Sequence, residues 1–431
     1  MPILKAFIYN KKYNIVLRKT NISLYFLNIA QYNQNVKRCG GERLITRIFN
    51  GVFITDKLET DKSLYIKDGK ILALTEEVFP FDKEIDAKGL YVSPGFIDIH
   101  THGAGGYDFA DGTVDDILNA SRVHAQHGTT TIFPTSASMS YEDTIKFILN
   151  VKKAIKHNTA GKPYIAGSHL EGPYFSQGQR GAQNPLYIKA PVKEEYTSFV
   201  EAGEGTVKRI SYAPELEGSD KLCEYLNKNG VISAFAHTDA VYEEIKPLID
   251  CGCKIATHLY SGMNTVTRKC LGRKLGGVET AFLEDDIYAE VIADGIHLPI
   301  PLLKLIYKIK GADKICLVTD SMRGAAQGEG KSVLGPKNNG VDCIVKDGIA
   351  YLPDMTAYAG SVATADRLIR VMHKDVGIPL CHVIKMMCET PAKAMNLKDR
   401  GKIADNYFAD LVFFDDDIKI QKVIIEGKEL Y

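Results

Sequence analysis

The sequence predicts an α/β protein, a (β/α)8 TIM-like barrel with a small β-sandwich domain formed by the N- and C-terminal segments. Three observations favour this fold. Eight apolar runs alternate with amphipathic stretches, turn-rich β segments stand at both ends, and polar residues recur at the C-terminal ends of the runs. In a barrel those strand ends converge on one face, where active sites are built. The number of runs alone would also suit a doubly wound sheet, so the polar residues decide between them.

Nearly all of the eight runs are rich in β-branched residues, and they adjoin helical stretches such as "VDDILNASRVHAQHG". Apolar strands that alternate with helices are typical of a parallel sheet covered on both faces. The runs are "GFIDIHTH" (95–102), "TTTIFPTSA" (129–137), "YIAGSHLEGP" (164–173), "VKRISYAPEL" (207–216), "VISAFAHTDA" (231–240), "CKIATHLYSGM" (253–263), "IYAEVIADGIH" (287–297) and "KICLVTDSM" (314–322).

Short alternating strands precede these runs and return after them. The first segment contains Asn-Gly and Asp-Gly turns at Asn50 and Asp68, which favour hairpins. A similar pattern ends the chain in "ADLVFFDDDIKIQKVIIEGKEL". We therefore expect residues 42–93 and 398–431 to pair into one small β-sandwich domain, and residues 94–397 to form the barrel.

Residues 1–41 differ in composition from the rest. They hold seven Lys or Arg and no Asp or Glu, and "NISLYFLNIA" is too short and too often interrupted by Asn for a secretory signal. We expect a disordered extension or a start placed too far upstream. Because the whole chain has 53 residues of each sign, the other residues carry seven more acidic than basic side chains. This argues against a nucleic-acid-binding face.

The composition indicates a globular enzyme. Hydrophobic residues make up 45% and charged residues 25%, which is ordinary for a soluble domain, and no apolar run reaches the length of a membrane span. The nine cysteines are scattered, and Cys251-Gly-Cys253 lacks the second pair that a structural zinc site needs. We expect reduced thiols, a cytoplasmic location, and neither membrane nor nucleic acid as a partner.

Residues of the types that bind metals end several of the predicted strands. One such residue taken alone is more often a hydrogen-bonded structural residue, but a set at one rim predicts a metal site. Neutral imidazoles with a carboxylate suit Zn²⁺ or Fe²⁺, and His-x-His in a strand places both rings on one face. The candidates are His100, His102, Glu171, His237, His258, Asp294, His297 and Asp320.

Asp320 ends the apolar run "LVTDSM", where a carboxylate without a role is costly to bury. A metal lowers the pKa of a water molecule, so a nearby carboxylate can take its proton during attack on a carbonyl carbon. The same group can return the proton to the leaving nitrogen. We expect Asp320 to act as general base and then as general acid.

Several stretches resemble the N-acetylglucosamine-6-phosphate deacetylases of the amidohydrolase superfamily. The resemblance runs from about residue 45 to the C-terminus and depends on "HLEGPYFS" (169–176), "THLYSGMN" (257–264), "IADGIHLP" (292–299) and "YAGSVATADRL" (358–368). It implies hydrolysis of N-acetyl-D-glucosamine 6-phosphate to D-glucosamine 6-phosphate and acetate. It also implies a homodimer and a divalent metal, Zn²⁺ with Fe²⁺ or Co²⁺ as alternatives.

The resemblance further implies roles for single residues. Glu171, His237 and His258 match the metal triad, and Asp320 matches the base. His297 matches a residue that orients the sugar. Positions that match the substrate pocket are Ala182, Gln183, Ser261, Gly262, Asp294, and the loop of Tyr358, Ala359 and Gly360.

Three departures from the family leave alternatives open. His100 and His102 are both kept, so they hold a second metal or pack beside a single-metal site. Gln183 replaces a histidine found in many relatives; it can donate an N–H to the oxyanion but offers no imidazolium. The family's Arg-Glu-Pro-Gly stretch, whose arginine holds phosphate across a dimer interface, is absent. Arg268 and Lys269 in "NTVTRKCLGRKLGG" bind the phosphate by another geometry or lie solvated.

These departures keep two other functions under consideration. An amidohydrolase acting on another N-acyl sugar or a cyclic amide is favoured if the altered phosphate segment changes the substrate. A non-catalytic barrel kept as a scaffold is least favoured, because such proteins typically lose ligands, whereas this chain keeps them all.

Overall fold

The computed structural model describes residues 44–430 apart from 160 and 270. The prediction for residues 1–41 lies outside this range. Within it, no helix combines the length and the apolar character that crossing a bilayer requires.

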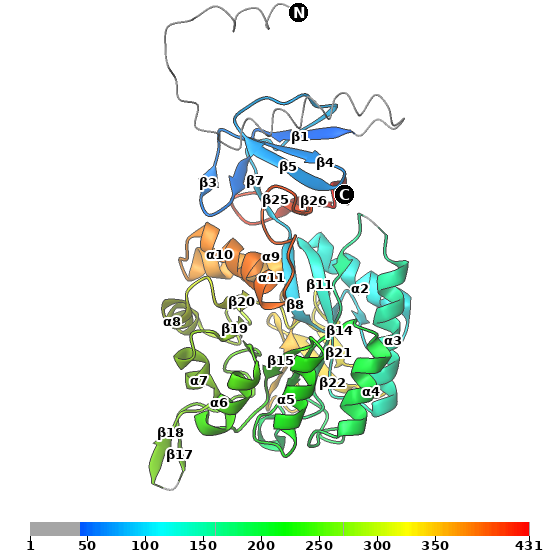
Figure 1. Cartoon of the computed structure of the whole chain (residues 1–431), viewed down its shortest axis with the longest axis vertical. Helices are drawn as coiled ribbons and strands as arrows, with labels where there is room; N and C mark the ends of the chain where they lie inside the picture. The colour runs from blue at the N-terminus through cyan, green and yellow to red at the C-terminus, as the bar shows by residue number, and fades with distance from the viewer. Residues whose placement is uncertain (1–43, 160, 270, 431) are drawn as a thin grey trace, which may run out of the picture. The chain divides into compact units, whose positions relative to one another are not determined.

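Eight parallel strands form the predicted barrel (Figure 1). Each predicted run contains one of these strands, and the eight follow one another around the sheet in chain order. The run from 164 to 173 also contains β12 (Tyr164–Ile165), a ninth strand of this sheet that pairs with β11. The strands are β8 (Phe96–Thr101), β11 (Thr129–Ser136), β13 (Ser168–Glu171), β14 (Val207–Tyr212), β15 (Ile232–Phe235), β16 (Ile255–Ala256), β19 (Tyr288–Val291) and β20 (Ile315–Leu317).

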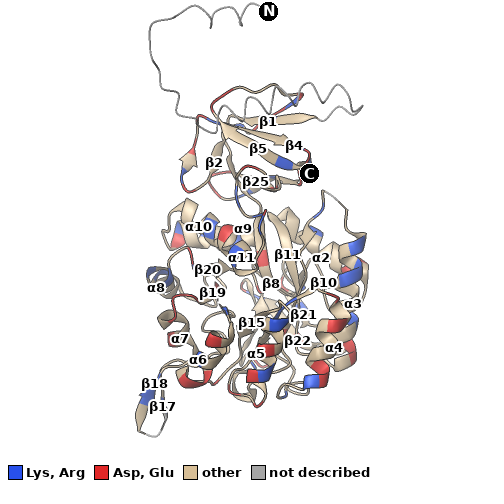
Figure 2. Ribbon diagram, in the orientation of Figure 1, with Lys and Arg blue, Asp and Glu red and all other residues tan. Residues whose placement is uncertain are grey.

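Helices cover the outside of the barrel, and the ribbon in Figure 2 shows positions of both basic and acidic residues along them. Thr113 begins α2 (Val114–Gln126) by accepting a hydrogen bond from the amide of Asp116, and Ile117 and Ala120 lie on its buried face. The helices that follow are α3 (Tyr141–His157), α4 (Lys193–Gly203), α5 (Ser219–Lys228), α6 (Tyr242–Cys251), α7 (Gly277–Leu283), α8 (Ile300–Lys310), α9 (Ala365–Arg370), α10 (Leu380–Met387) and α11 (Glu389–Ala394).

Strands from the two ends of the described chain pair with each other. β7 (Tyr91–Pro94) lies antiparallel to β25 (Leu411–Phe414), with Ser93 opposite Val412. These two strands belong to a six-stranded sheet that also holds β2 (Val52–Ile54), β3 (Leu58–Glu59), β26 (Ile420–Ile425) and β27 (Lys428–Glu429). A four-stranded sheet contains β1 (Ile45–Phe49), β4 (Ser63–Lys67), β5 (Lys70–Thr75) and β6 (Lys83–Asp86).

Three insertions among the described residues stand outside the regular alternation of strand and helix. The first is a short hairpin of β9 (Gly103–Ala104) and β10 (Tyr107–Asp108). A meander after β20 contains β21 (Gly330–Leu334), β22 (Val341–Lys346), β23 (Ile349–Tyr351) and β24 (Tyr358–Ser361). The stretch from Tyr358 to Gly360, expected as a loop, is therefore part of a strand. A hairpin of β17 (Thr267–Lys269) and β18 (Gly272–Lys274) projects from the barrel (Figure 1).

The barrel closes where its last strand meets its first. The amide of Asp320 donates to the carbonyl oxygen of His100 at 2.9 Å. Below this contact, the hydroxyl of Thr319 donates to the buried Asp98 at 2.6 Å, across 221 residues of sequence. Burial raises the pKa of Asp98 to about 7, because the ionised carboxylate loses contact with water. The Thr319 hydroxyl therefore satisfies a group that water cannot reach.

Thr319→Val tests this contact. The change keeps the shape of the side chain but leaves an oxygen of Asp98 without its donor, so the free energy of unfolding should fall by about 1–3 kcal/mol in urea denaturation at fixed metal content. Thr356→Val is the matched control, because Thr356 makes a similar bond to Asp354 in an exposed position. That variant should stay within about 0.5 kcal/mol of the parent. Equal effects of the two changes would contradict a special role for the closure contact.

Candidate active site

A cavity of about 300 Å³ opens at the C-terminal ends of the barrel strands. It contains most of the residues predicted for the site. Its lining consists of His102, Glu171, Gly181, Ala182, Gln183, His237, His258, Tyr260, Ser261, Gly262, His297, Asp320, Leu334, Ala357, Tyr358 and Gly360. His100 is fully buried at its base, and part of the wall comes from the β21–β24 meander.

Glu171 lies at the centre of the histidines. Its Oε1 is 2.8 Å from Nε2 of His258 and 3.2 Å from Nε2 of His237. Its Oε2 is 3.3 Å from Nε2 of His102. One carboxylate therefore lies close to imidazoles from the ends of three different barrel strands, β8, β15 and β16.

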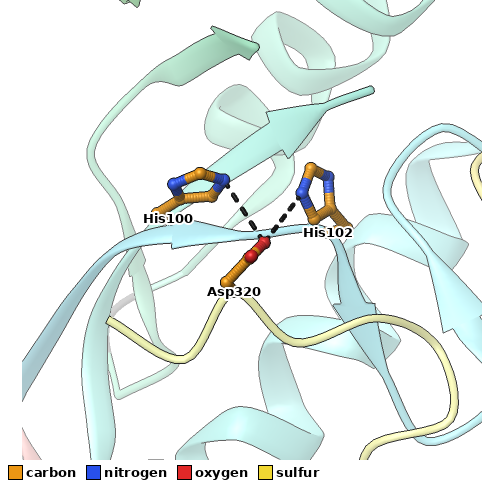
Figure 3. A group of neighbouring side chains, drawn as sticks. All are labelled: His100, His102 and Asp320. Carbon is orange, nitrogen blue, oxygen red and sulfur yellow. Dashed lines mark ion pairs between the residues drawn. The ribbon is translucent and has the colours of Figure 1, made fainter. Parts of the chain in front are cut away.

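Asp320 faces the same cluster from the end of β20. Its Oδ1 lies 3.4 Å from Nε2 of His100 and 3.1 Å from Nε2 of His102 (Figure 3). Donor atoms of His100, His102 and Asp320 lie within 4.8 Å of one another, and so do those of His100, Glu171 and His258. Two groups of ligand atoms thus share His100.

The buried imidazoles and carboxylates of this cluster strongly shift one another's pKa values. Burial would lower the pKa of His100, but the surrounding carboxylates, Asp320 foremost, raise it to about 9. Burial would raise the pKa of Glu171, but the imidazoles, His100 foremost, hold it well below its usual range. Nε2 of His100 is buried and makes no hydrogen bond. Imidazole nitrogens and carboxylate oxygens that lie this close together, with Nε2 of His100 among them, fit a divalent metal.

Three of the predicted metal ligands have strained backbone at the strand ends. His237, His258 and Asp320 have φ angles of 45°, 27° and 45°, in the left-handed region that non-glycine residues rarely adopt. Such conformations cost on the order of 1–3 kcal/mol each and persist where the surroundings impose them. Here they accompany the turn of each chain segment at the rim of the cavity.

Hydrogen bonds to the far ring nitrogens orient two of the histidines. Nδ1 of His237 lies 2.8 Å from the carbonyl oxygen of Gln179, and this oxygen only accepts, so Nδ1 carries the proton. Nδ1 of His100 lies 3.1 Å from Oε2 of Glu290. In both rings the Nε2 atom is then left to face the cluster.

Glu290 and Arg209 were missed by the sequence analysis. Both are fully buried and pair with each other beneath His100. Burial would raise the pKa of Glu290, but Arg209 and His100 lower it to about 2. Each interrupts an apolar run, "IYAEVIADGIH" or "VKRISYAPEL", and a charge inside such a run is the signal that could have identified them.

Gln183 has a different set of contacts from the one expected. Its Nε2 donates to Oε2 of Glu171 at 2.7 Å, and its Oε1 accepts from the amide of Ser138 at 2.7 Å. The side chain amide thus orients Glu171 as well as lining the cavity. Gly262 is needed for space, because a Cβ there would lie 2.6 Å from Nδ1 of His237.

His297 and Tyr358 form the outer part of the cavity. Nδ1 of His297 lies 2.8 Å from Oδ2 of Asp294, and the two rings of His297 and Tyr358 have centroids 5.0 Å apart. Asp294 is buried behind His297 and does not line the cavity. Asp294 fixes the orientation of the His297 imidazole, and Nε2 of that ring is left to contact a ligand.

Three other predicted substrate residues lie elsewhere. Ala359 is buried behind its neighbours in β24, and Arg268 is on the projecting β17–β18 hairpin. The side chain of Lys269 lies outside the described side chains. Among the described residues that line the cavity, none is Lys or Arg.

Comparison with known proteins shows the family of the chain. The sequence profile of the amidohydrolase family matches residues 91–430. An N-acetylglucosamine-6-phosphate deacetylase of Lysinibacillus sphaericus is 29% identical over 369 residues, 85% of this chain and 92% of that protein. An N-acetylgalactosamine-6-phosphate deacetylase of Shewanella sp. is 30% identical over 341 residues, 78% of this chain and 82% of that protein.

A solved structure gives the same result for the fold. It is the N-acetyl-D-glucosamine-6-phosphate deacetylase of Mycobacterium smegmatis, which aligns with a TM-score of 0.82 at 28% identity. The alignment covers 90% of this chain and all of that one. With a family match over most of its length and the metal-type ligands at its strand ends, the chain belongs to the amidohydrolase family.

Proposed function

We propose that the chain hydrolyses the N-acetyl group of N-acetyl-D-glucosamine 6-phosphate to D-glucosamine 6-phosphate and acetate, in amino-sugar catabolism in the cytoplasm. The observation that carries the proposal is the convergence of Glu171, four histidines and Asp320 on one cavity. The named relatives support the substrate class. A non-catalytic scaffold would have no reason to keep the strained ligand positions.

The cofactor in this proposal is a divalent metal, for which we favour Zn²⁺ over Fe²⁺ and Co²⁺. We favour two ions, one at Glu171, His237 and His258 and one at His100, His102 and Asp320, because Glu171 reaches histidines of both groups. A bound ion of this kind lowers the pKa of water and polarises a carbonyl oxygen.

The chain's own residues supply the remaining steps. Asp320 takes the proton of the attacking water and returns it to the nitrogen of the leaving amine. His297, held by Asp294, presents its free ring nitrogen to the sugar hydroxyls. Tyr358 offers an aromatic surface beside it for the sugar ring.

The phosphate requires charges from outside this cavity, because none of its described lining residues is Lys or Arg. We propose a homodimer in which the β17–β18 hairpin of one subunit reaches the cavity of the other. Arg268 and Arg273 are opposite each other in the hairpin, and Leu271 at its tip is 88% exposed. A two-stranded hairpin is marginally stable by itself, which favours contact with another surface.

The substrate proposal is tested by steady-state hydrolysis of three sugars with metal content measured. We expect the highest kcat/KM on N-acetylglucosamine 6-phosphate and a much lower value on unphosphorylated N-acetylglucosamine. N-Acetylgalactosamine 6-phosphate is the third substrate, because the Shewanella relative is named for it. A higher value on that sugar would replace the proposed substrate, and equal values on both forms of N-acetylglucosamine would remove the phosphate from the proposal.

Asp320→Asn tests the acid–base role. The amide cannot accept the proton, so kcat should fall by about 10²–10⁴-fold while metal remains bound at Glu171, His237 and His258. Elemental analysis and single-turnover kinetics measure the two quantities. Asp366→Asn is the control, because Asp366 also pairs with a histidine, His127, but is not among the lining residues. A near-normal kcat for the Asp320 variant would exclude this role.

Arg268→Ala combined with Arg273→Ala tests the hairpin. If these cations hold the phosphate, KM for the phosphorylated sugar should rise about tenfold or more, as expected for loss of charge-assisted hydrogen bonds. The rate on the unphosphorylated sugar should stay unchanged. Sedimentation of the parent should show a dimer. A monomeric, fully active parent would contradict the arrangement.

A further inference from the structure

A buried ion pair lies inside the barrel beneath the cavity. Glu290 comes from β19 and Arg209 from β14, and both side chains are fully buried. Because β15 and β16 separate these strands in the sheet, the pair spans the interior of the barrel. Neither residue lines the cavity itself.

The carboxylate of Glu290 reaches two segments of the site, one in β8 and one after β16. Its Oε2 lies 3.1 Å from Nδ1 of His100 and accepts from the amide of His258 at 3.3 Å. Its Oε1 accepts from Nη1 of Arg209. Oε2 thus contacts the residues of the site, while Oε1 is bound to the guanidinium of Arg209.

Arg209 is fixed in turn by a chain of hydroxyl groups. Its Nη2 donates to Oγ1 of Thr257 at 2.7 Å, which lies 3.0 Å from Oγ of Ser211. That oxygen is 2.7 Å from Nε2 of His169. The ring of His169 packs edge-on against His100, with centroids 4.8 Å apart. His100 is therefore held through its ring nitrogen and against its ring face.

Stability alone does not account for such an arrangement. Removing two charges from water is costly, and apolar side chains of similar volume often stabilise a core equally well. A carboxylate bonded to the far nitrogen of a metal-binding histidine fixes the tautomer and makes the imidazole a stronger donor. His102 has no such support, because its Nδ1 makes no hydrogen bond among the described residues.

We propose that Glu290, anchored by Arg209, is a positioning residue that accepts a hydrogen bond from Nδ1–H of His100 and thereby aims Nε2 of that ring at the metal. The inference rests on the proposed metal-dependent function and goes beyond it, because it assigns the strength of metal binding to a pair outside the cavity. His100 becomes the well-fixed ligand of the His-x-His pair, and His102 the adaptable one.

The experiment is a metal titration and needs no turnover. The full chain is stripped by a chelator and titrated with Zn²⁺ against a chromophoric competitor. Glu290→Gln should lower the affinity for an ion by about 10–100-fold, the usual effect of removing such a partner. An affinity equal to that of the parent would overturn the proposal. A parent that binds Zn²⁺ but fails to hydrolyse the sugar would remove the proposed function and leave this measurement standing.

A double-mutant cycle tests whether the effect passes through His100. In a His100→Asn background, Glu290→Gln should cause no further loss of affinity, because its partner is already gone. An undiminished further loss would show that Glu290 acts by another route, and would overturn the proposal. If Glu290→Gln does not fold, Glu290→Asp keeps the charge toward Arg209 while withdrawing the oxygen from His100, and the same outcomes apply.

A matched control separates metal binding from stability. Arg400 and Asp410 form another buried arginine–carboxylate pair, which joins the segment after α11 to β25 and its neighbours. Asp410→Asn should lower the denaturation midpoint as Glu290→Gln does, but leave Zn²⁺ affinity unchanged. Equal losses of affinity in the two variants would show that a general loosening of the fold, and not His100, explains the result.

Discussion

The buried charge of Glu171 is the constraint on which the rest of the site depends. A carboxylate without access to water needs donors or positive charge on both oxygens. Here imidazoles from β8 and from the ends of β15 and β16 approach it, and the Gln183 amide meets the remaining oxygen. The C-terminal ends of these strands must therefore lie at the same level along the barrel axis. The barrel provides that alignment because its strands are parallel and adjacent.

This alignment requires unfavourable backbone conformations, which the packing around them stabilises. Left-handed backbone at His237, His258 and Asp320 places three strand-end segments in a conformation that non-glycine residues rarely adopt. The amide of Asp320 and the carbonyl of His100 bond directly at the closure of the barrel. The same closure brings Asp320 within 3.4 Å of His100 and 3.1 Å of His102, so closing the barrel also assembles this part of the site.

Much of the fold and part of the site could be predicted from the sequence, for identifiable reasons. Apolar runs and the polar residues at their ends are local patterns, so the eight strands and the ligand types were visible. Contacts across the barrel are not local: the pairing of Glu290 with Arg209 depends on the register of strands 81 residues apart. The contacts of Gln183 and the β21–β24 meander likewise depend on segments that carry no repeating pattern.

The closure of the barrel has a consequence for synthesis. His100 and His102 leave the ribosome early, whereas Asp320 follows more than two hundred residues later, and the two meet only when β20 docks against β8. A nascent chain therefore lacks Asp320 beside the His-x-His pair until nearly the whole barrel has emerged. The approach of Asp320 to the His-x-His pair is therefore coupled to completion of the barrel, and a product truncated before β20 would carry the two histidines without that carboxylate.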